Sequence, residues 1–290
     1  NMNIALTGSS GELGSHLLDD LRKMGHNVLC ISSSFSSSKE NIYSYQEILS
    51  QSTNFQADYF LHLATLNSDL SEAQVAMEIS LTNTAIKCME KLKCKNFIFF
   101  SSIKVYGENS FNLHKFTEDS SPLPQSPYGL AKLECEKVIL QNAEIKHFNY
   151  LIFRLSPVLI NGTKSSLGMI FRIIQMGIPL PTFKVGDSNK RSFLSYNFLN
   201  LVLKITFDDL KRVNNNFFNL SDSIPISTNA LYGKLAKAVN KKPRIIYLPN
   251  FLFRAMMKVN RLQLILAKLF GNFYTPNDKL KTKFNIPENH

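Results

Sequence analysis

The sequence predicts an α/β fold, with a doubly wound parallel sheet and a smaller C-terminal α/β lobe. Three observations support this fold class. Short apolar runs alternate with helical patterns through the first half of the chain, which is typical of a parallel sheet covered by helices. The first apolar run leads directly into a glycine-rich turn. The 290 residues are 44% hydrophobic, which is enough for one large core and an appended lobe.

Each element of the first half is predicted from its own pattern. Strands are expected where short apolar runs occur, at residues 2–7, 27–31, 58–63, 96–101 and 150–154. Helices are expected where apolar residues recur at helical spacing, at residues 12–24, 71–92 and 125–142. Gly25 is a suitable stop for the first helix, and residues 32–38 form a serine-rich loop.

The pattern is looser in the second half of the chain. Helices are expected at residues 166–176, 226–239 and 251–270, and a short strand at residues 244–248. We place the division between the two parts after residue 160. Residues 1–160 then form the sheet domain, and residues 161–290 form most of the lobe, with segments that cross back.

The net charge of +11 is concentrated near the C-terminus. Residues 230–290 hold 12 Lys and Arg but only 2 Asp and Glu, whereas the other residues hold 21 and 20. A basic lobe suits a pyrophosphate, a membrane surface or a nucleic acid, or it is a solvated face without a ligand. No nucleic-acid-binding module is recognisable, so no nucleic acid is expected as a partner.

The segment 251–270 combines apolar and basic residues and would suit a membrane surface. We favour the alternative, in which it packs on its own domain, and expect no stable membrane association. No apolar run approaches the roughly 18 residues of a membrane-spanning helix. The four cysteines follow no ligand or disulfide pattern, which indicates free thiols in a reducing compartment, so we expect a cytoplasmic protein without a metal site.

The turn from Thr7 to Gly14 has the spacing G-x-x-G-x-x-G between the first strand and the first helix. Glycines there permit a tight turn and a close approach of a pyrophosphate, which the helix N-terminus attracts with its free N–H groups. This context predicts a Rossmann-type dinucleotide site, so we assign residues 1–160 to an NAD(P)-binding domain. The residues expected to hold the cofactor here are Gly8, Ser10, Gly11, Glu12, Leu13 and Gly14.

The second strand runs into Ser32, Ser33 and Ser34, without the acidic residue that holds a ribose 2′-hydroxyl. A carboxylate would repel a 2′-phosphate, so its absence, with Lys39 nearby, favours NADP over NAD without excluding NAD. Ser32 is expected to contact the cofactor.

Tyr128 and Lys132 are spaced i and i+4 on a predicted helix, which places them on one face. A tyrosine with a pKa of about 10 is a poor base at neutral pH, but a neighbouring ammonium favours its phenolate. Such a phenol can exchange a proton with a sugar hydroxyl during hydride transfer. Ser102 ends a buried strand, where ligands of parallel sheets lie. The glycine turn, Ser102 and the Tyr–Lys pair together indicate a hydride-transfer enzyme. His62 is expected to be a packed core residue.

These residues resemble the extended short-chain dehydrogenase/reductases, the NAD-dependent epimerase/dehydratase family. Its motifs are matched at residues 7–14, 61–64, 100–107 and 126–132. The resemblance implies that Ser102 orients the substrate oxygen, that Tyr128 is the acid and base, and that Lys132 also holds the nicotinamide ribose. It implies further cofactor contacts by Leu63, Ala64 and Asn83, the last as the family's helix asparagine. It also implies a homodimer formed through parts of 71–92 and 126–144.

The second half is similar to bacterial surface-polysaccharide enzymes that act at C4 of UDP-N-acetylhexosamine-type sugars. The matching segments are 158–164, 177–181, 189–193, 218–222 and 277–287. The similarity implies a nucleoside-diphosphate sugar as substrate, with Arg191 on the diphosphate, which its fork of donors suits. Lys104 is expected to be a further substrate contact. The departures from the family at residues 155–162 and 196–198 leave the identity of the sugar open.

Two reactions at C4 remain possible, a 4-epimerisation and the reduction of a 4-keto sugar. The short chain and the absent carboxylate after the second strand tilt the interpretation slightly toward the reductase. A 4,6-dehydratase is disfavoured, because Ile103 and Lys104 follow Ser102 where an Asp-Glu pair would be expected. The alternatives of other classes are an inactive NAD(P)-binding sensor or scaffold and a membrane-associated structural protein.

Overall fold

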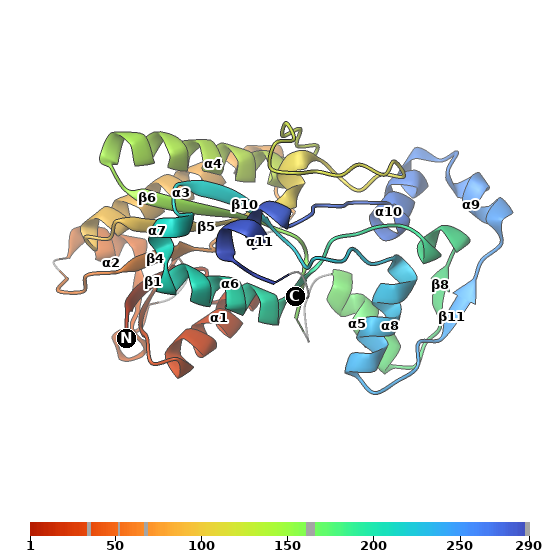
Figure 1. The fold of residues 1–290 in the computed structure, drawn as a ribbon, viewed down its shortest axis with the longest axis horizontal. Coiled ribbons are helices and arrows are strands. Elements are labelled where there is room, and N and C mark those ends of the chain that lie inside the picture. The colour runs from red at the N-terminus through yellow and green to blue at the C-terminus, as the bar shows by residue number, and fades with distance from the viewer. Residues whose placement is uncertain (34–35, 52, 67–68, 161–165, 288–290) are drawn as a thin grey trace. The chain divides into compact units, whose positions relative to one another are not determined.

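The computed structural model describes residues 1–33, 36–51, 53–66, 69–160 and 166–287 (Figure 1). The chain forms two compact units, each made of three segments. The first unit comprises residues 1–107, 121–155 and 205–218. The second comprises residues 108–120, 156–204 and 219–290. Among the described helices, none has the length and apolar character that crossing a membrane requires.

A seven-stranded sheet forms the centre of the first unit, in the order β10-β6-β5-β4-β1-β2-β3. The strands are β1 (Asn3–Thr7), β2 (Asn27–Ser32), β3 (Ile42–Ser44), β4 (Tyr59–His62), β5 (Asn96–Ser102), β6 (Asn149–Leu155) and β10 (Asn216–Leu220). Every pairing from β3 to β6 is parallel. The strand order reverses between β1 and β4, and ligands of such sheets bind beyond the strand ends at this switch. The predicted fold class is confirmed.

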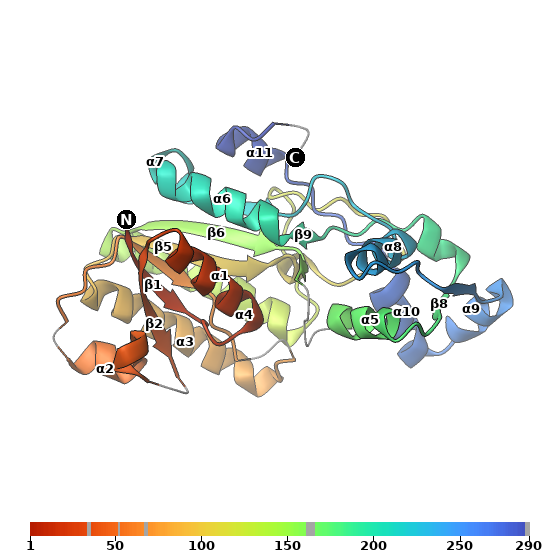
Figure 2. The same ribbon diagram turned by 90° about the horizontal axis from the view of Figure 1, so that it is seen from below.

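Helices cover both faces of this sheet (Figures 1 and 2). One face packs on α2 (Tyr45–Ser50), α3 (Glu72–Lys91) and α4 (Pro127–Lys146), and α1 (Glu12–Lys23) lies on the other. Alternate strand residues share a face, so Phe97 and Phe99 of β5 join Phe60 and Ile152 in the core beneath α3 and α4. The core on this face is therefore built from every second strand residue, and the intervening residues, such as Ile98 and Leu151, are buried on the other face.

The second unit is built on short strands and amphipathic helices. Its helices include α5 (Ser166–Gln175), α8 (Thr228–Ala238) and α11 (Asp278–Phe284), and α6 (Tyr196–Asp208) spans the boundary between the units. β8 (Leu180–Thr182) pairs with β11 (Ile245–Tyr247), and β7 (Val158–Leu159) pairs with β9 (Leu194–Ser195), both in parallel. The second unit also contains the 3-10 turn η3 (Lys184–Asp187). The remaining short elements belong to the first unit, namely α7 (Leu210–Val213) and the 3-10 turns η1 (Ser38–Glu40) and η2 (Ile103–Tyr106).

The single helix expected at 251–270 is wrong. The structure has two helices there, α9 (Asn250–Met256) and α10 (Asn260–Phe270), with Val259 in an extended conformation between them. The reason lies in the packing around Phe183. Phe253 of α9 and Phe270 of α10 both meet its ring edge to face, with centroids 5.1 and 5.6 Å away. A break lets both helices reach this one ring, which a straight helix of the same length would not allow.

Candidate active site

The glycine turn after β1 packs tightly against the end of β4. Gly8 has a φ of +77°, and a Cβ on it would lie 2.7 Å from the Ala64 nitrogen and 2.9 Å from the Leu63 carbonyl carbon. A Cβ on Gly14 would lie 2.0 Å from the Gly8 oxygen. Only glycine can occupy these positions without moving the backbone. The structure therefore brings Leu63 and Ala64 to the predicted cofactor turn.

The first turn of α1 is open to an anion. Gly11 is the N-cap residue and has no side chain to bond the helix N–H groups, and its own N–H donates to the Gly8 oxygen at 3.1 Å. The amides of Glu12 and Leu13 begin the helix, and Ser10 is exposed beside them. Uncapped N–H groups and the helix dipole attract phosphate. The turn therefore suits the pyrophosphate of a dinucleotide.

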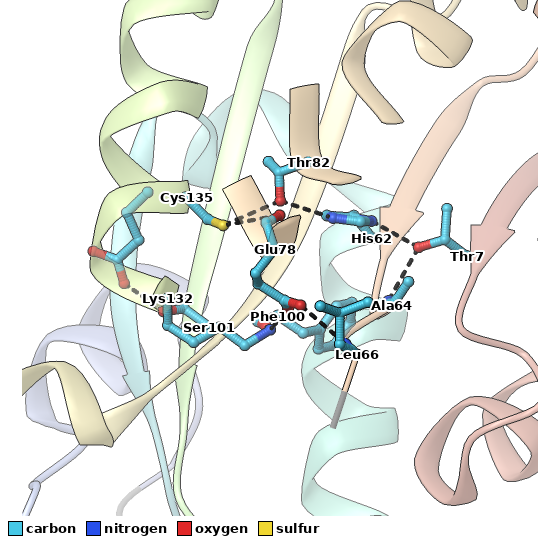
Figure 3. A network of polar contacts seen from close by, with 11 residues as sticks. Thr7, His62, Ala64, Leu66, Glu78, Thr82, Phe100, Ser101, Lys132 and Cys135 are labelled. Carbon is cyan, nitrogen blue, oxygen red and sulfur yellow. Dashed lines mark hydrogen bonds and ion pairs between the residues drawn. The ribbon is translucent and has the colours of Figure 1, made fainter. Parts of the chain in front are cut away.

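A buried chain of hydrogen bonds joins β1 to β4 below this turn (Figure 3). The Ala64 N–H donates to Thr7 Oγ1 at 3.1 Å, and Thr7 Oγ1 lies 2.7 Å from His62 Nδ1. His62 Nε2 lies 3.1 Å from Thr82 Oγ1, which donates to Cys135 Sγ. Burial, and then the charge of Lys132, lowers the pKa of His62 to about 3. His62 is therefore a neutral core residue, as predicted.

The end of β5 directs two successive serines to different partners. The hydroxyl of Ser102 accepts the Lys104 N–H at 3.2 Å, whereas Ser101 donates to Glu136 at 2.5 Å. Gly129 packs on the same turn, because a Cβ on it would lie 2.4 Å from the Lys104 oxygen. Since Gly129 follows Tyr128, this close contact brings the start of α4 against the segment that follows Ser102.

Tyr128 lies in the first turn of α4, and local sequence explains why the helix begins there. Ser126 is the N-cap and accepts the Gly129 N–H at 3.2 Å, and Pro127 occupies the first helical position. Lys132 follows one turn later and is almost completely buried, with its Nζ 5.7 Å from the centre of the Tyr128 ring. The predicted pair therefore shares one face of α4.

Three groups hold the buried ammonium of Lys132, and two of them, Phe100 and Glu78, are labelled in Figure 3. Its Nζ donates to the Phe100 oxygen at 3.3 Å, lies over the Phe99 ring at 5.0 Å, and forms an ion pair with Glu78 at 3.8 Å. The exposed fractions of the Lys132 and Glu78 side chains are 3% and 2%. A buried cation needs such partners, because desolvation is costly. The ammonium is thereby fixed beside the tyrosine.

Glu78 is a site residue that the sequence analysis missed. Its second oxygen accepts the Leu66 N–H at 2.9 Å, so one carboxylate joins Lys132 to the loop after β4. A signal was present in the sequence. Glu78 shares the inward face of α3 with Thr82, Ala85 and Met89, and a carboxylate on an apolar helix face calls for a buried partner.

Asn83, the predicted helix asparagine, lies in the middle of α3 and is partly buried. Its amide donates to the Ile79 oxygen of its own helix at 3.3 Å, whereas Glu78 and Thr82 face the site. Asn83 directly follows Thr82, which lies on the inward face of α3. A contact of Asn83 with the cofactor stays untested.

A second buried ion pair supports the end of β5. Arg154 donates to both oxygens of Glu136 at 3.0 and 2.7 Å and to the Tyr106 hydroxyl at 2.9 Å. Burial by itself lowers the pKa of Arg154, but Glu136 and Tyr106 outweigh it and raise this pKa above its usual value. Because Ser101 also donates to Glu136, the pair fixes the strand that carries Ser102.

Ser32 is the last residue of β2, the strand next to β1, and Lys39 is exposed on η1. Ser34, at the end of the serine run, lies outside the described residues. The cofactor contact of Ser32 and the substrate contact of Lys104, which is partly buried on η2, therefore stay predictions.

Arg191 belongs to the second unit and is the one predicted site residue outside the first. Its guanidinium donates to the Leu269 oxygen at 3.2 Å and lies over the Phe193 ring at 5.0 Å. Burial lowers its pKa to about 10, so it remains charged at neutral pH. Within the described part of the chain, no carboxylate forms an ion pair with it. Such a cation is available to an anionic ligand.

The chain is similar to proteins of one known family. A family model described as the NAD dependent epimerase/dehydratase family matches residues 4–194. A UDP-glucose 4-epimerase of Vibrio cholerae is 33% identical over 178 residues, which cover 61% of this chain and 50% of that protein. The chain thus matches about half the length of this relative.

Two further proteins extend the comparison. An N-acetyl-alpha-D-glucosaminyl-diphospho-ditrans,octacis-undecaprenol 4-epimerase of Escherichia coli is 24% identical, over 86% of this chain and 76% of that protein. The solved structure of a UDP-glucuronic acid 4-epimerase from Bacillus cereus, in complex with NAD, has a TM-score of 0.74 at 19% identity, over 99% of this chain and 91% of that one. The preference for NADP finds no support in these comparisons.

Proposed function

The chain belongs to the NAD dependent epimerase/dehydratase family, and from this premise we propose that it is an NAD-dependent 4-epimerase of a UDP-sugar. The observation that carries the proposal is the ammonium of Lys132, buried in the first unit and held beside the ring of Tyr128 by three partners. A lysine on an ordinary helix surface would remain in water. Here a charged ammonium is buried next to a phenol, at the sheet edge where ligands bind.

The residues of the first unit suit NAD and a sugar hydroxyl. Gly8, Gly11 and Gly14 leave room for the pyrophosphate against the N-terminus of α1. The chemistry that bound NAD would supply is a reversible acceptor for the hydride of C4. Tyr128 takes the proton of the 4-hydroxyl as a base and gives it back as an acid. Lys132 stabilises the phenolate, and the Ser102 hydroxyl orients the reacting oxygen.

Epimerisation is favoured over reduction of a keto sugar. The sequence alone tilted toward a reductase, but the relatives described above are 4-epimerases. A 4-epimerase restores its coenzyme in every cycle, so no net redox change accompanies turnover. Arg191 is charged and has no ion-pair partner among the described residues, and it suits the diphosphate of the substrate because a guanidinium can hold two phosphate oxygens.

The test is incubation of the purified protein with NAD and, in turn, UDP-glucose, UDP-galactose, UDP-N-acetylglucosamine and UDP-glucuronic acid. Proton NMR of the sugar should reveal interconversion of the C4 epimers, while the absorbance of reduced coenzyme stays flat. Net formation or consumption of NADH or NADPH with a keto product would instead identify a reductase. Tyr128→Phe should lower kcat by about 10²–10⁴-fold and retain NAD binding, since only proton transfer is lost.

The second candidate is an NAD-binding sensor or scaffold without catalysis. Such a protein needs the glycine turn but no acid and base, so Tyr128→Phe would leave its cofactor affinity and its biological output intact. The buried Lys132 beside Tyr128 favours the enzyme. Loss of turnover in Tyr128→Phe, with unchanged NAD binding, separates the two.

We also propose a homodimer, formed through α3 and α4. Large apolar side chains lie exposed on both helices, namely Met77 on α3 and Leu130 and Leu140 on α4. Light scattering should report twice the chain mass, and Leu140→Glu should shift the protein to the monomer. The four cysteines are free and buried, which supports the proposal of a cytoplasmic enzyme. The resemblance of the second half supports a proposed role in surface-polysaccharide synthesis.

A further inference from the structure

Helices α9 and α10 of the second unit have inward faces with a clear structural role. Leu266 and Phe270 of α10 are buried against Phe183, and Phe253 and Met256 of α9 pack on the same cluster. Figure 1 shows the two helices near each other, at the end of this unit that also holds β8 and β11. Burial of these residues therefore explains why the helices form, but it leaves their outer faces unexplained.

The outer face of α10 carries two large aliphatic residues between two cations. Leu264 and Ile265 are adjacent, and each lies three or four residues from both Arg261 and Lys268, so the four form one continuous stripe. Leu264 is 69% exposed and Ile265 is 48% exposed, and both cations are exposed. An ordinary surface helix would present polar residues here, because aliphatic side chains are stabilised by leaving water and not by exposure to it.

The outer part of α9 and the connection to α10 repeat this composition. Phe251 is 74% exposed and is followed at i+3 by the exposed Arg254. Lys258 and Val259 connect the helices, and Val259 is 49% exposed. We define the α9–α10 surface by these four residues and the stripe of α10. Its members are Phe251, Arg254, Lys258, Val259, Arg261, Leu264, Ile265 and Lys268.

No carboxylate is available within this part of the chain to neutralise the α9–α10 surface. The sequence has no Asp or Glu between Asp222 and Asp278, but nine Lys and Arg. The two bounding acids already have partners, since Asp222 accepts the Ser195 N–H and Asp278 lies 3.8 Å from Lys115. None of the cations of the α9–α10 surface forms an ion pair with another described residue.

Although the sequence alone favours packing of this segment on its own domain, we propose that the outward-facing α9–α10 surface docks reversibly on an anionic lipid membrane. Cations on such a surface pair with headgroup phosphates, while neighbouring Phe, Leu and Ile side chains reach the acyl boundary, and the long Lys and Arg stems accommodate both positions. A nucleic acid would match the charge but not the exposed aliphatic pair. A second copy of the chain offers no acidic surplus, because residues 1–229 hold 21 basic and 20 acidic residues. The docking is peripheral and weakens with salt.

Vesicle co-sedimentation of the full chain tests the proposal. Wild-type protein should pellet with vesicles of equal parts phosphatidylglycerol and phosphatidylcholine, but not with phosphatidylcholine alone. Leu264→Ser with Ile265→Ser, and separately Arg261→Glu with Lys268→Glu, should each reduce the bound fraction about tenfold, which corresponds to about 1.4 kcal/mol. Wild-type protein that stays in the supernatant overturns the proposal, as does an aliphatic double variant that binds like wild type.

A matched control separates docking from net charge. Lys234→Glu with Lys237→Glu makes the same charge change on α8, within the same acid-free stretch, and should bind vesicles like wild type. If it loses binding as much as the α10 charge variant, the effect belongs to overall charge and the proposal fails. Preferential binding of the α9–α10 surface to a DNA duplex in the presence of vesicles would also overturn it.

Tryptophan fluorescence locates the contact. The chain contains no tryptophan, so Leu264→Trp creates a single reporter on the α9–α10 surface. Its emission should shift to the blue on anionic vesicles and be quenched by brominated lipids. Ile224→Trp, at an exposed position outside α9 and α10, should show neither change. A response at position 224 but not at 264 would place the contact elsewhere. Because no substrate is present in these measurements, their outcome does not depend on the proposed enzymatic activity.

Discussion

Glu78 shows how a single buried carboxylate can organise a site. It accepts the Leu66 N–H and faces the Lys132 ammonium at 3.8 Å. Glu78→Gln keeps an acceptor but removes the charge, which leaves a buried cation with fewer partners. We expect it to lower the free energy of unfolding by about 1–3 kcal/mol, measured by urea denaturation. In a Lys132→Met background the same change should cost clearly less. Equal costs in both backgrounds would deny the coupling.

His62 makes stability depend on pH. Burial first, and Lys132 second, lowers its pKa from 6.5 to about 3 in the folded protein. The unfolded chain therefore binds the proton more readily below pH 6.5. The stability contributed by neutral His62 is complete above pH 6.5 and is lost as pH falls toward 3, at up to about 1.4 kcal/mol per pH unit. Urea midpoints measured from pH 7 to pH 5 should fall less steeply in His62→Gln, whose side chain cannot titrate. Parallel pH curves for both proteins would contradict this assignment.

At the level of elements, the contact between α4 and η2 sets the position of Tyr128. A Cβ on Gly129 would lie 2.4 Å from the backbone oxygen of Lys104, so Gly129→Ala must displace the start of α4. Small displacements in a reacting geometry are costly, and we expect kcat to fall about 10²-fold in a protein that remains folded. Gly233→Ala is the control, because nothing lies within 4 Å of a Cβ at that helical position. Full activity in Gly129→Ala would show that this contact does not position Tyr128.

The elements that the sequence predicted well are those whose signals are local. The strand, glycine turn and helix at the N-terminus follow from adjacent residues, and α3 begins one residue after Ser71, inside the predicted range. β3 and α2 were missed although α2 begins with a capping box of Ser44 and Glu47, because Tyr45–Ser50 is too short for a helical period. The break between α9 and α10 depends on Phe183, far away in sequence, so the local pattern could not reveal it.

The same reason separates the predicted from the missed parts of the site. The glycine turn and the Tyr–Lys pair are motifs of residues close in sequence. In the structure Gly8 packs on Leu63 and Ala64, and the Lys132 ammonium lies beside the Tyr128 ring. Glu78 of α3 forms an ion pair with Lys132 of α4, and Gly129 of α4 packs on the backbone of Lys104 in η2. Such contacts form only when α3, α4 and β5 have packed together. Long-range contacts were thus the part that the sequence did not disclose.

At the level of the whole molecule, the second unit depends on a segment from the first half of the chain. Glu118 accepts the buried Asn219 N–H at 2.8 Å, and Ser110 and Asn272 form a β-bridge. Residues 161–290 expressed alone lack these partners and leave a buried N–H unsatisfied. We expect this fragment to show poor NMR dispersion and no cooperative unfolding. Restoring residues 108–120 on a linker should recover part of both signals. A fragment that unfolds cooperatively without them would contradict this dependence.

The strand order also affects how the protein is made. β10 closes the sheet beside β6, yet most of the chain between these two strands belongs to the second unit. β10 is therefore synthesised long after β6. While the ribosome is still synthesising those segments, β6 has an open edge with the apolar sequence Tyr150 to Phe153. Unpaired apolar edges recruit other chains. Translation that stops before residue 216 should therefore yield aggregates, and nascent chains of this length are expected to need a chaperone until β10 emerges.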